Sequence, residues 1–332
     1  MSTKPVGESR ADERPWRRGA FINGVKDRAA TWKPQVVPRS LRMFPFTAPN
    51  TPTSVEPLAV EDELGMNFNT EWAREPGARI ARRAIQNALL IPGLRALTTP
   101  EILGLDRIQH LSGPLIFAAN HHSHLDTGVV LSALPRKIRE KTIIAAASDY
   151  FFDKRLKAIL SALTINAVPI ERKKVSRRST DQIKALLLDG WSIVIFPEGG
   201  RSPDGLGQEF KAGAMFLAQR SGCVVVPVHI DGTNVVLPKG ATFPKRHTCT
   251  VTFGHPIAAD SSADPRALSE QLERAVNALA EESRTDWWTA RRNAATDATP
   301  SLRGNESASS WRRQWSKSST KATAEKPKRT WP

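Results

Sequence analysis

The sequence predicts an α/β domain with a mixed central sheet flanked by helices, and irregular basic arms at its two ends. Between about residues 105 and 285, short β-branched runs alternate with stretches of helical periodicity. The chain has 332 residues, 40% of them apolar, which is enough to bury a sizeable core. We expect an N-terminal arm over 1–75, an amphipathic helical segment over 76–104, one folded domain over 105–285 and a disordered tail over 286–332.

The helical segment before the domain is strongly amphipathic. Prolines recur through the first 57 residues, which predicts an irregular arm, and "ARIARRAIQNALLIPG" follows. Its spacing predicts an apolar face and a polar face. The apolar face holds Ile80, Ala84, Ala88 and Ile91, and the polar face holds Arg79, Arg82, Arg83 and Gln86. Pro92 is expected to end this helix. Two interpretations stay open: a surface helix packed on the core, or a helix lying in a lipid headgroup layer.

The strands of the domain are predicted from apolar runs rich in β-branched residues. These runs are "PLIFAA", "TIIAAA", "INAVPI", "SIVIF", "CVVVPVHI" and "CTVTF". Helical stretches such as "RLKAILSAL", "DQIKALLLDG" and "KAGAMFLAQRSG" separate them, and a final helix is expected from Pro265 to about Glu282. In open α/β sheets ligands bind beyond the carboxyl ends of the strands, so the loops after "PLIFAA" and "SIVIF" are the places to look for a site.

The first of these loops is "ANHHSHLD", and three interpretations of it are open. Its three histidines could hold a metal ion, although their spacing on a strand-to-helix turn scatters the rings. Ser123 and Asp126 have the spacing of a capping box, which would make Asp126 structural. Finally, His121 could precede the helix and meet Asp126, whose carboxylate would fix the imidazole tautomer and leave the other nitrogen to accept a proton. His122 and His124 are then bystanders.

The second loop, "PEGGRSPDG", has the composition of an oxyanion site. Gly199 and Gly200 allow backbone N–H groups to approach an anion closely, and the Arg201 guanidinium can hold phosphate through two parallel hydrogen bonds. Glu198 can hold that guanidinium or substrate hydroxyls. Arg172, which begins a basic run, is a further candidate for a phosphate ligand. A plain turn with solvated basic residues is the alternative for both segments.

These residues together resemble the glycerophospholipid acyltransferases, including 1-acyl-sn-glycerol-3-phosphate acyltransferase. The family motif N-H-x-S-x-x-D is matched by Asn120, His121, Ser123 and Asp126. The motif F-P-E-G-T-R-S is matched over 196–202 except that Gly200 replaces the threonine, and elements similar to F-K-x-G and V-P-V lie at 210–213 and 226–228. Of the motif G-x-x-F-I-x-R, only the isoleucine and arginine occur, at 170 and 172. The resemblance covers about residues 100–285.

The resemblance implies an O-acyltransferase of phospholipid biosynthesis that moves a fatty acyl group from acyl-CoA or acyl carrier protein to a lysophosphatidate-like acceptor. His121 and Asp126 would be catalytic and Asn120 and Ser123 supporting. Glu198, Gly199, Gly200, Arg201, Arg172 and Lys211 would bind substrate. Neither metal nor cofactor is implied. Glycerol 3-phosphate or another lysophospholipid is an alternative acceptor, and a metal-dependent hydrolase or a basic nucleic-acid-binding protein is an alternative from another class, with nucleic acid the less expected partner.

Charge and composition favour a peripheral association with a membrane. The net charge is +15, and residues 284–332 hold 11 Lys/Arg against 4 Asp/Glu together with five tryptophans. Basic residues favour anionic lipid surfaces, and indole rings favour the membrane–water interface. A solvated tail without a partner and a tail that binds nucleic acid are the alternatives. The N-terminus has no apolar signal segment and no apolar run reaches the length of a spanning helix. Cys223 and Cys249 have no ligand spacing near them. We therefore expect a peripheral protein on the cytoplasmic face of the cell membrane.

Overall fold

The computed structural model describes residues 64–171, 177–202, 205–238 and 240–303. They form a seven-stranded sheet in the order β1-β7-β6-β2-β5-β3-β4. The strands are β1 (Glu101–Leu103), β2 (Leu115–Ala119), β3 (Thr142–Ala147), β4 (Ala167–Ile170), β5 (Ser192–Ile195), β6 (Val224–Asp231) and β7 (Thr250–Phe253). All neighbours pair in parallel except β6 and β7, which are antiparallel. The predicted mixed sheet is confirmed, and the six predicted strands are all present.

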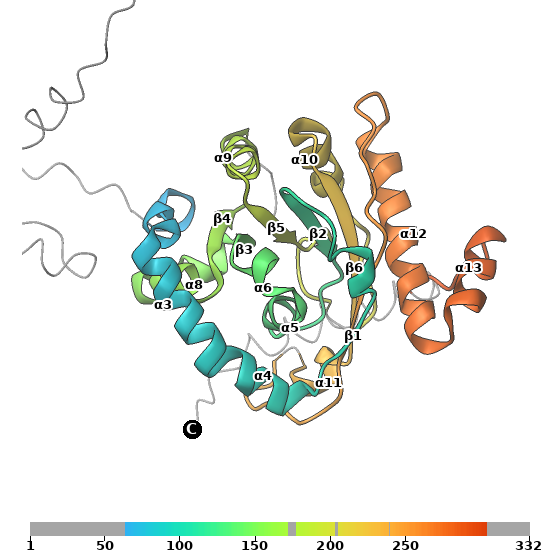
Figure 1. The fold of residues 1–332 in the computed structure, drawn as a ribbon, viewed down its shortest axis with the longest axis horizontal. Coiled ribbons are helices and arrows are strands. Elements are labelled where there is room, and N and C mark those ends of the chain that lie inside the picture. Colours follow the sequence, from blue (N-terminus) through green and yellow to red (C-terminus); the bar gives the residue numbers. More distant parts are fainter. Residues whose placement is uncertain (1–63, 172–176, 203–204, 239, 304–332) are drawn as a thin grey trace, which may run out of the picture. The chain divides into compact units, whose positions relative to one another are not determined.

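Helices cover both faces of this sheet (Figure 1). They are α3 (Pro76–Ile85), α4 (Ile91–Thr98), α5 (Asp126–Ala133), α6 (Arg136–Arg139), α7 (Ser148–Phe151), α8 (Arg155–Ile165), α9 (Arg177–Leu188), α10 (Gly213–Ser221), α11 (Thr233–Val236), α12 (Pro265–Arg284) and α13 (Trp287–Ala295). Short 3-10 turns lie at Gly65–Asn67, Glu71–Arg74 and Leu105–Arg107. Alternation along β2 divides the core: Ile116 packs with α9, α10 and α12, whereas Phe117 packs with α4 and α5.

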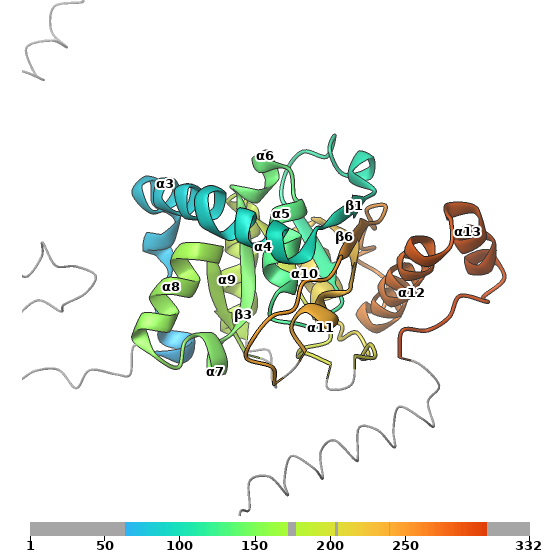
Figure 2. The same ribbon diagram turned by 90° about the horizontal axis from the view of Figure 1, so that it is seen from below.

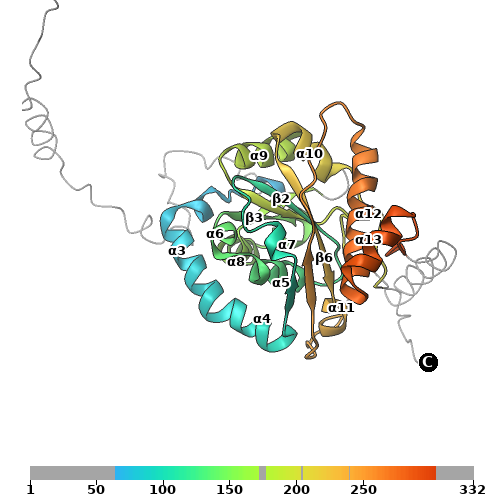
Figure 3. The ribbon, with the colours of Figure 1, turned by 45° about the vertical axis from the view of Figure 1, so that its right-hand side comes forward.

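The helix before the domain does not end at Pro92. Residues Gln86–Leu90 form a π turn, in which the Ile91 N–H bonds to Gln86 O, five residues earlier. A π turn shifts the hydrogen-bond ladder by one residue, and proline, which has no N–H to donate, follows directly. The chain then continues as α4 to Thr98, so α3 and α4 form one long curved element along the edge of the domain (Figure 3).

The polar face of α3 is the packed face. Arg82 is buried and donates to Leu163 O at 2.9 Å near the end of α8, and Gln86 Nε2 donates to Thr164 O at 2.9 Å. Ile80, on the opposite face, is 64% exposed, and Ala84 and Ala88 are exposed as well. Ile91, also on the predicted apolar face, is buried. The helix therefore packs on the domain, as one interpretation expected, but α3 does so through Arg82 and Gln86. The carbonyls at the end of α8 need donors, and arginine and glutamine provide them.

The expected disorder from residue 286 onward is wrong as far as residue 303. Asp286 caps α13 by accepting from Thr289 N at 3.0 Å, and α13 packs against α12 (Figure 2). Further on, Arg303 donates to Glu273 at 2.6 and 2.5 Å. The composition of the tail therefore did not predict α13 or the ion pair of Arg303 with Glu273. Residues 304–332, which hold the tryptophans at 311, 315 and 331, lie outside the described residues, as does the N-terminal arm up to residue 63.

Candidate active site

The two motif loops meet at the carboxyl edge of the sheet. The loop holding His121 follows β2, and the loop holding Glu198 and Arg201 follows β5. Because β2 and β5 are paired neighbours in parallel, their ends lie side by side. Backbone contacts join the loops: the Ser202 N–H donates to His121 O at 2.9 Å. The sequence prediction that both loops occupy this edge is confirmed by the sheet order.

His121 and Asp126 form a hydrogen-bonded pair. His121 Nδ1 lies 2.9 Å from Asp126 Oδ2, with Asp126 wholly buried and the His121 side chain 18% exposed. Because an ionised carboxylate can only accept, the contact requires a proton on Nδ1. In the neutral ring Nε2 is then free to accept a proton. Phe196 stacks on the imidazole with centroids 4.1 Å apart and restricts its plane further.

Asp126 is also the structural cap of its own loop. Its Oδ2 accepts the N–H groups of His122 and Ser123 at 2.7 and 2.8 Å, while Oδ1 accepts the hydroxyl of Thr233. The contacts of Asp126 thus fit the structural interpretation and also place its carboxylate on His121, as the proton-transfer interpretation requires. Sequence reasoning missed Thr233. It follows β6, which neighbours β2, so a hydroxyl just beyond "VPVHID" was a usable signal.

Asn120 and Ser123 hold the loop in place. The Asn120 side chain bonds to both backbone groups of Ile230 on β6, each at 2.8 Å. The Ser123 hydroxyl donates to Leu237 O at 2.9 Å and is fully buried. These contacts fit the supporting roles predicted for both residues. The hydroxyl of Ser123 is directed to a backbone carbonyl, which is not an arrangement for a nucleophile.

Glu198 is directed to the backbone of the histidine loop and not to a guanidinium. Its Oε1 accepts the His121 N–H at 3.0 Å, and the carboxyl group is buried. Burial raises the pKa of Glu198 to about 8, against the opposing effect of the N–H groups of His121 and Gln208. Its Oε2 is buried without a hydrogen-bond partner among the described residues, which suits a protonated carboxyl. Glu198 thus acts as a brace between the loops, by which we mean that its side chain links the second loop to the backbone of the first through a hydrogen bond.

The two glycines of the second loop differ in what they require. Gly199 has φ +72°, and a Cβ there would collide with the Lys211 side chain, which lies across it. Gly200 has an ordinary φ, and a Cβ there would meet no atom within 4 Å. The family threonine therefore fits at 200, whereas the positive φ at 199 strains any residue other than glycine.

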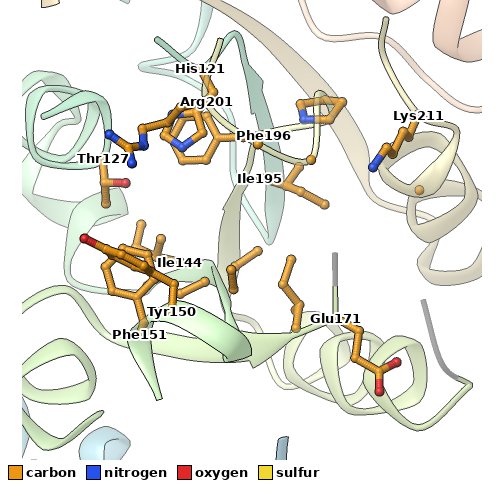
Figure 4. Close-up of a pocket in the computed structure, with 18 of the residues that line it drawn as sticks. His121, Thr127, Ile144, Tyr150, Phe151, Glu171, Ile195, Phe196, Arg201 and Lys211 are labelled. Atoms are coloured by element: carbon orange, nitrogen blue, oxygen red, sulfur yellow. The ribbon is translucent and has the colours of Figure 1, made fainter. Parts of the chain in front are cut away.

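A pocket of about 180 Å³ opens between these loops and the ends of β3 and β4. His121, Arg201 and Lys211 lie on its rim, and apolar side chains such as Ile144 and Ile195 form its floor (Figure 4). Arg201 is on the same side as His121, and Lys211 is on the other. The pocket thus combines an apolar interior with cationic and proton-accepting groups. Gly199 and Gly200 also line it; Arg172 lies outside the described residues.

The three histidines of the first loop have separate partners. His122 is buried and lies 3.5 Å from Asn120 Nδ2, whereas His124 Nε2 lies 3.1 Å from the Tyr150 hydroxyl in the pocket wall. Burial lowers the pKa of His124 to about 4, and the charges of Arg201 and His121 act in the same direction. The His124 ring lines the pocket, and its assignment as a bystander stays a prediction. Across the described ranges, no group of three His, Cys, Asp or Glu side chains is arranged to hold a metal ion.

Residues 302–303, near the end of the described chain, contact the stretch that follows the second loop. Leu302 O accepts the Gly207 N–H at 2.8 Å, and Glu273 on α12 holds both Arg303 and the Phe210 N–H, the latter at 3.0 Å. Gln208, between these contacts, donates its side chain to Gly200 O at 3.1 Å. Lys211 follows directly in the chain. The loop that carries Lys211 is therefore fixed by residues 302–303 and by α12.

Comparison with known proteins agrees with this fold and these motifs. Residues 99–231 match the family model described as Acyltransferase. A chloroplastic 1-acyl-sn-glycerol-3-phosphate acyltransferase of Arabidopsis thaliana is 30% identical over 166 residues, covering 49% of this chain and 44% of that protein. One from Brassica napus is 29% identical over 167 residues, covering 49% and 46%. The matched segment thus spans less than half the length of these curated relatives.

A solved structure shares the fold. The 1-acyl-sn-glycerophosphate acyltransferase PlsC of Thermotoga maritima superimposes with a TM-score of 0.50 over 66% of this chain and 85% of that one, at 22% identity. The described domain therefore shares the fold of that acyltransferase, and residues 99–231 match the Acyltransferase family model. The resemblance to the glycerophospholipid acyltransferases is confirmed by similar relatives that carry the name 1-acyl-sn-glycerol-3-phosphate acyltransferase.

Proposed function

We propose that the protein transfers a fatty acyl group from a thioester to the free hydroxyl of a 1-acylglycerol 3-phosphate. The observation that carries the proposal is the His121–Asp126 pair on the rim of an apolar pocket that also presents Arg201. The relatives with the matching domain bear the name of this activity. Acylation of glycerol 3-phosphate or of another lysophospholipid would use the same groups.

In the proposed reaction His121 is the general base. Its Nε2 takes the proton of the acceptor hydroxyl, and the oxygen attacks the thioester carbonyl. The carbon–sulfur bond then breaks, and the imidazolium returns its proton to the departing thiolate. Asp126 holds the Nδ1 proton throughout and stabilises the imidazolium. Every atom is accounted for without an acyl-enzyme, and Ser123 stays in its structural contact with Leu237 O.

Arg201 is placed to bind the phosphate of the acceptor, because it shares the His121 side of the pocket. A guanidinium can hold two phosphate oxygens at once, which would orient the acceptor hydroxyl toward Nε2. Lys211, on the far side, supplies a second cation. The apolar floor between them suits an acyl chain. We include Glu198, Gly199 and Gly200 as parts of this binding loop, with Glu198 acting through the backbone of His121.

The donor and the location belong to the proposal as well. Acyl-CoA or acyl carrier protein supplies the thioester, and the protein works as a peripheral protein at an anionic membrane, on its cytoplasmic face. No helix in the described part of the chain combines the length and apolar character needed to cross a bilayer. The competing metal-hydrolase hypothesis needs converging histidines, and the three rings here have different partners. A nucleic-acid-binding protein would not need the pair at all.

The test is a transfer assay with the purified full chain. Glycerol 3-phosphate, lysophosphatidate and other lysophospholipids are offered with acyl-CoA and, separately, with acyl carrier protein. We expect the highest kcat/KM for lysophosphatidate, abolished by His121→Ala and insensitive to a chelator. Hydrolysis without transfer, lost on chelation, would favour the hydrolase. Affinity for nucleic acid that falls steeply with salt and survives His121→Ala would favour the other alternative.

A further inference from the structure

The outer face of α8 carries exposed apolar side chains next to the pocket. Leu156 is 66% exposed and Leu160 is 49% exposed, and residues four apart in a helix lie on the same side. With neighbouring side chains they line a shallow groove of about 410 Å³. We name Leu156, Leu160 and this groove the α8 surface. Exposing two leucine side chains to water costs free energy, so covering the surface with an apolar partner would be favourable.

The α8 surface adjoins the pocket directly. Phe151 and Ile165 line both the groove and the pocket. An apolar chain lying on the surface would therefore meet the pocket at these two apolar side chains. Tyr150, which contacts His124 in the pocket, also contacts the helix, because Lys157 Nζ lies 3.7 Å above its ring.

The first turn of α8 is basic. Lys154, Arg155 and Lys157 lie there, opposed by Asp149 and by Asp153, which pairs with Lys157 at 3.2 Å. Leucines flanked by lysines are the combination that favours an anionic lipid surface, since the methyl groups enter the acyl region and the cations meet the headgroups.

From these contacts we propose that the α8 surface is seated on an anionic bilayer and delivers the lipid acyl chain to the pocket between Phe151 and Ile165. This inference rests on the proposed function, which makes the acceptor a membrane lipid. It assigns the membrane contact to α8 and not to the exposed face of α3. Other occupants, such as a second copy of the chain, are outcomes of the test below.

The experiment compares full-length variants in sedimentation with phosphatidylcholine vesicles containing phosphatidylglycerol. The double variant Leu156→Ser/Leu160→Ser is matched by Ile80→Ser on α3, whose side chain is 64% exposed and lies away from the pocket lining. We expect the double variant to bind vesicles at least ~10-fold more weakly, since both leucine side chains lose their burial in the acyl region. Ile80→Ser should bind like the parent protein. Lys154→Glu should weaken binding to anionic vesicles more than to neutral ones.

Activity readouts separate this inference from the proposed function. The double variant should lose turnover of vesicle-embedded acceptor but keep turnover of a water-soluble, short-chain acceptor. If vesicle binding falls as expected while no acceptor is acylated by any form, the surface stands and the function fails. Unchanged vesicle binding in the double variant overturns the inference. So does an equal loss in Ile80→Ser, or the conversion of a dimer to a monomer without any loss of vesicle binding.

Discussion

The carboxyl group of Glu198 accepts the backbone N–H of His121 at 3.0 Å, so an acidic residue of one loop positions the proposed general base of the other. Because burial raises the pKa of Glu198 to about 8, the folded protein binds a proton there that the unfolded chain releases above its ordinary pKa of 4.5. The contribution to stability is complete below that value and is lost as the pH rises toward 8.

Glu198→Gln should therefore flatten the pH dependence of stability. We expect the free energy of unfolding of the parent protein to fall between about pH 5 and pH 8, by up to about 1.4 kcal/mol per pH unit, and that of Glu198→Gln to fall less. Urea denaturation of both proteins across this range measures it. Parallel curves would show that Glu198 is ionised in the folded state, and Glu198→Ala serves as the control for loss of the brace.

His121→Ala should lower kcat by roughly 100-fold to 10,000-fold because it removes the proposed general base. Asp126→Asn should also lower kcat and in addition destabilise the fold, since Asp126 accepts from two backbone N–H groups and from Thr233. His122→Ala is the control, with a ring directed away from the pocket. Rapid-quench measurement of turnover together with thermal melting separates the loss of kcat from the loss of stability. If His122→Ala lowers kcat as much as His121→Ala does, the assignment of His121 as the general base is contradicted.

Arg201→Lys should act on acceptor binding. The variant keeps the charge but loses the paired hydrogen bonds, so KM for a phosphate-bearing acceptor should rise by roughly 10-fold to 100-fold, corresponding to about 1.5–3 kcal/mol. Steady-state kinetics with acceptor and donor varied in turn gives the answer. If KM for the acceptor is unchanged and that for acyl-CoA rises, the loop binds the donor.

Gly200→Thr should be tolerated, whereas Gly199→Ala should not. A side chain at 200 meets open space, but at 199 it meets positive φ and the Lys211 side chain. We expect Gly199→Ala to lower stability by about 1–2 kcal/mol and to displace Lys211, raising KM. The matched pair differs by one position in the chain, so similar melting temperatures and KM values for the two variants would argue against the described loop.

The C-terminal segment gives a sharp pair of truncations. Ending the chain after Arg303 keeps the contact with Glu273, and we expect unchanged melting and unchanged turnover of a soluble acceptor. Ending it after Pro300 leaves the carboxylate of Glu273 without its arginine and frees the loop before Lys211. The melting temperature should fall and KM should rise. Arg303→Gln in the full chain is the control. Equal melting temperatures and KM values of the two truncations would contradict the proposal that residues 302–303 fix the loop before Lys211.

The regular part of the fold was predictable because its signals are local. Six strands appear as apolar runs, and the seventh, β1, was missed because three half-exposed residues at a sheet edge form no such run. α13 was missed because a Ser- and Lys-rich composition outweighed the Asp286 cap. The burial of Arg82 and Gln86 on α3 was not predictable from the helix itself. It depends on backbone carbonyls at the end of α8 that accept their hydrogen bonds.

The site was predictable where chemistry follows side-chain type and spacing. The pair His121 and Asp126 was found in this way. The role of Glu198 was not, because its partner is a backbone N–H from another loop. Thr233 was missed for a related reason: its contact depends on the neighbour order of β2 and β6, which the sequence does not state.

Arg82 and Ile80 exchange the roles that their side chains usually have. The guanidinium of Arg82 is buried against the end of α8, and burial lowers its pKa to about 10. Ile80, two residues away, faces outward. A library of random substitutions should therefore accept serine, lysine or glutamate at 80 and reject leucine or methionine at 82, so the charged residue would score as a core position and the isoleucine as a surface position.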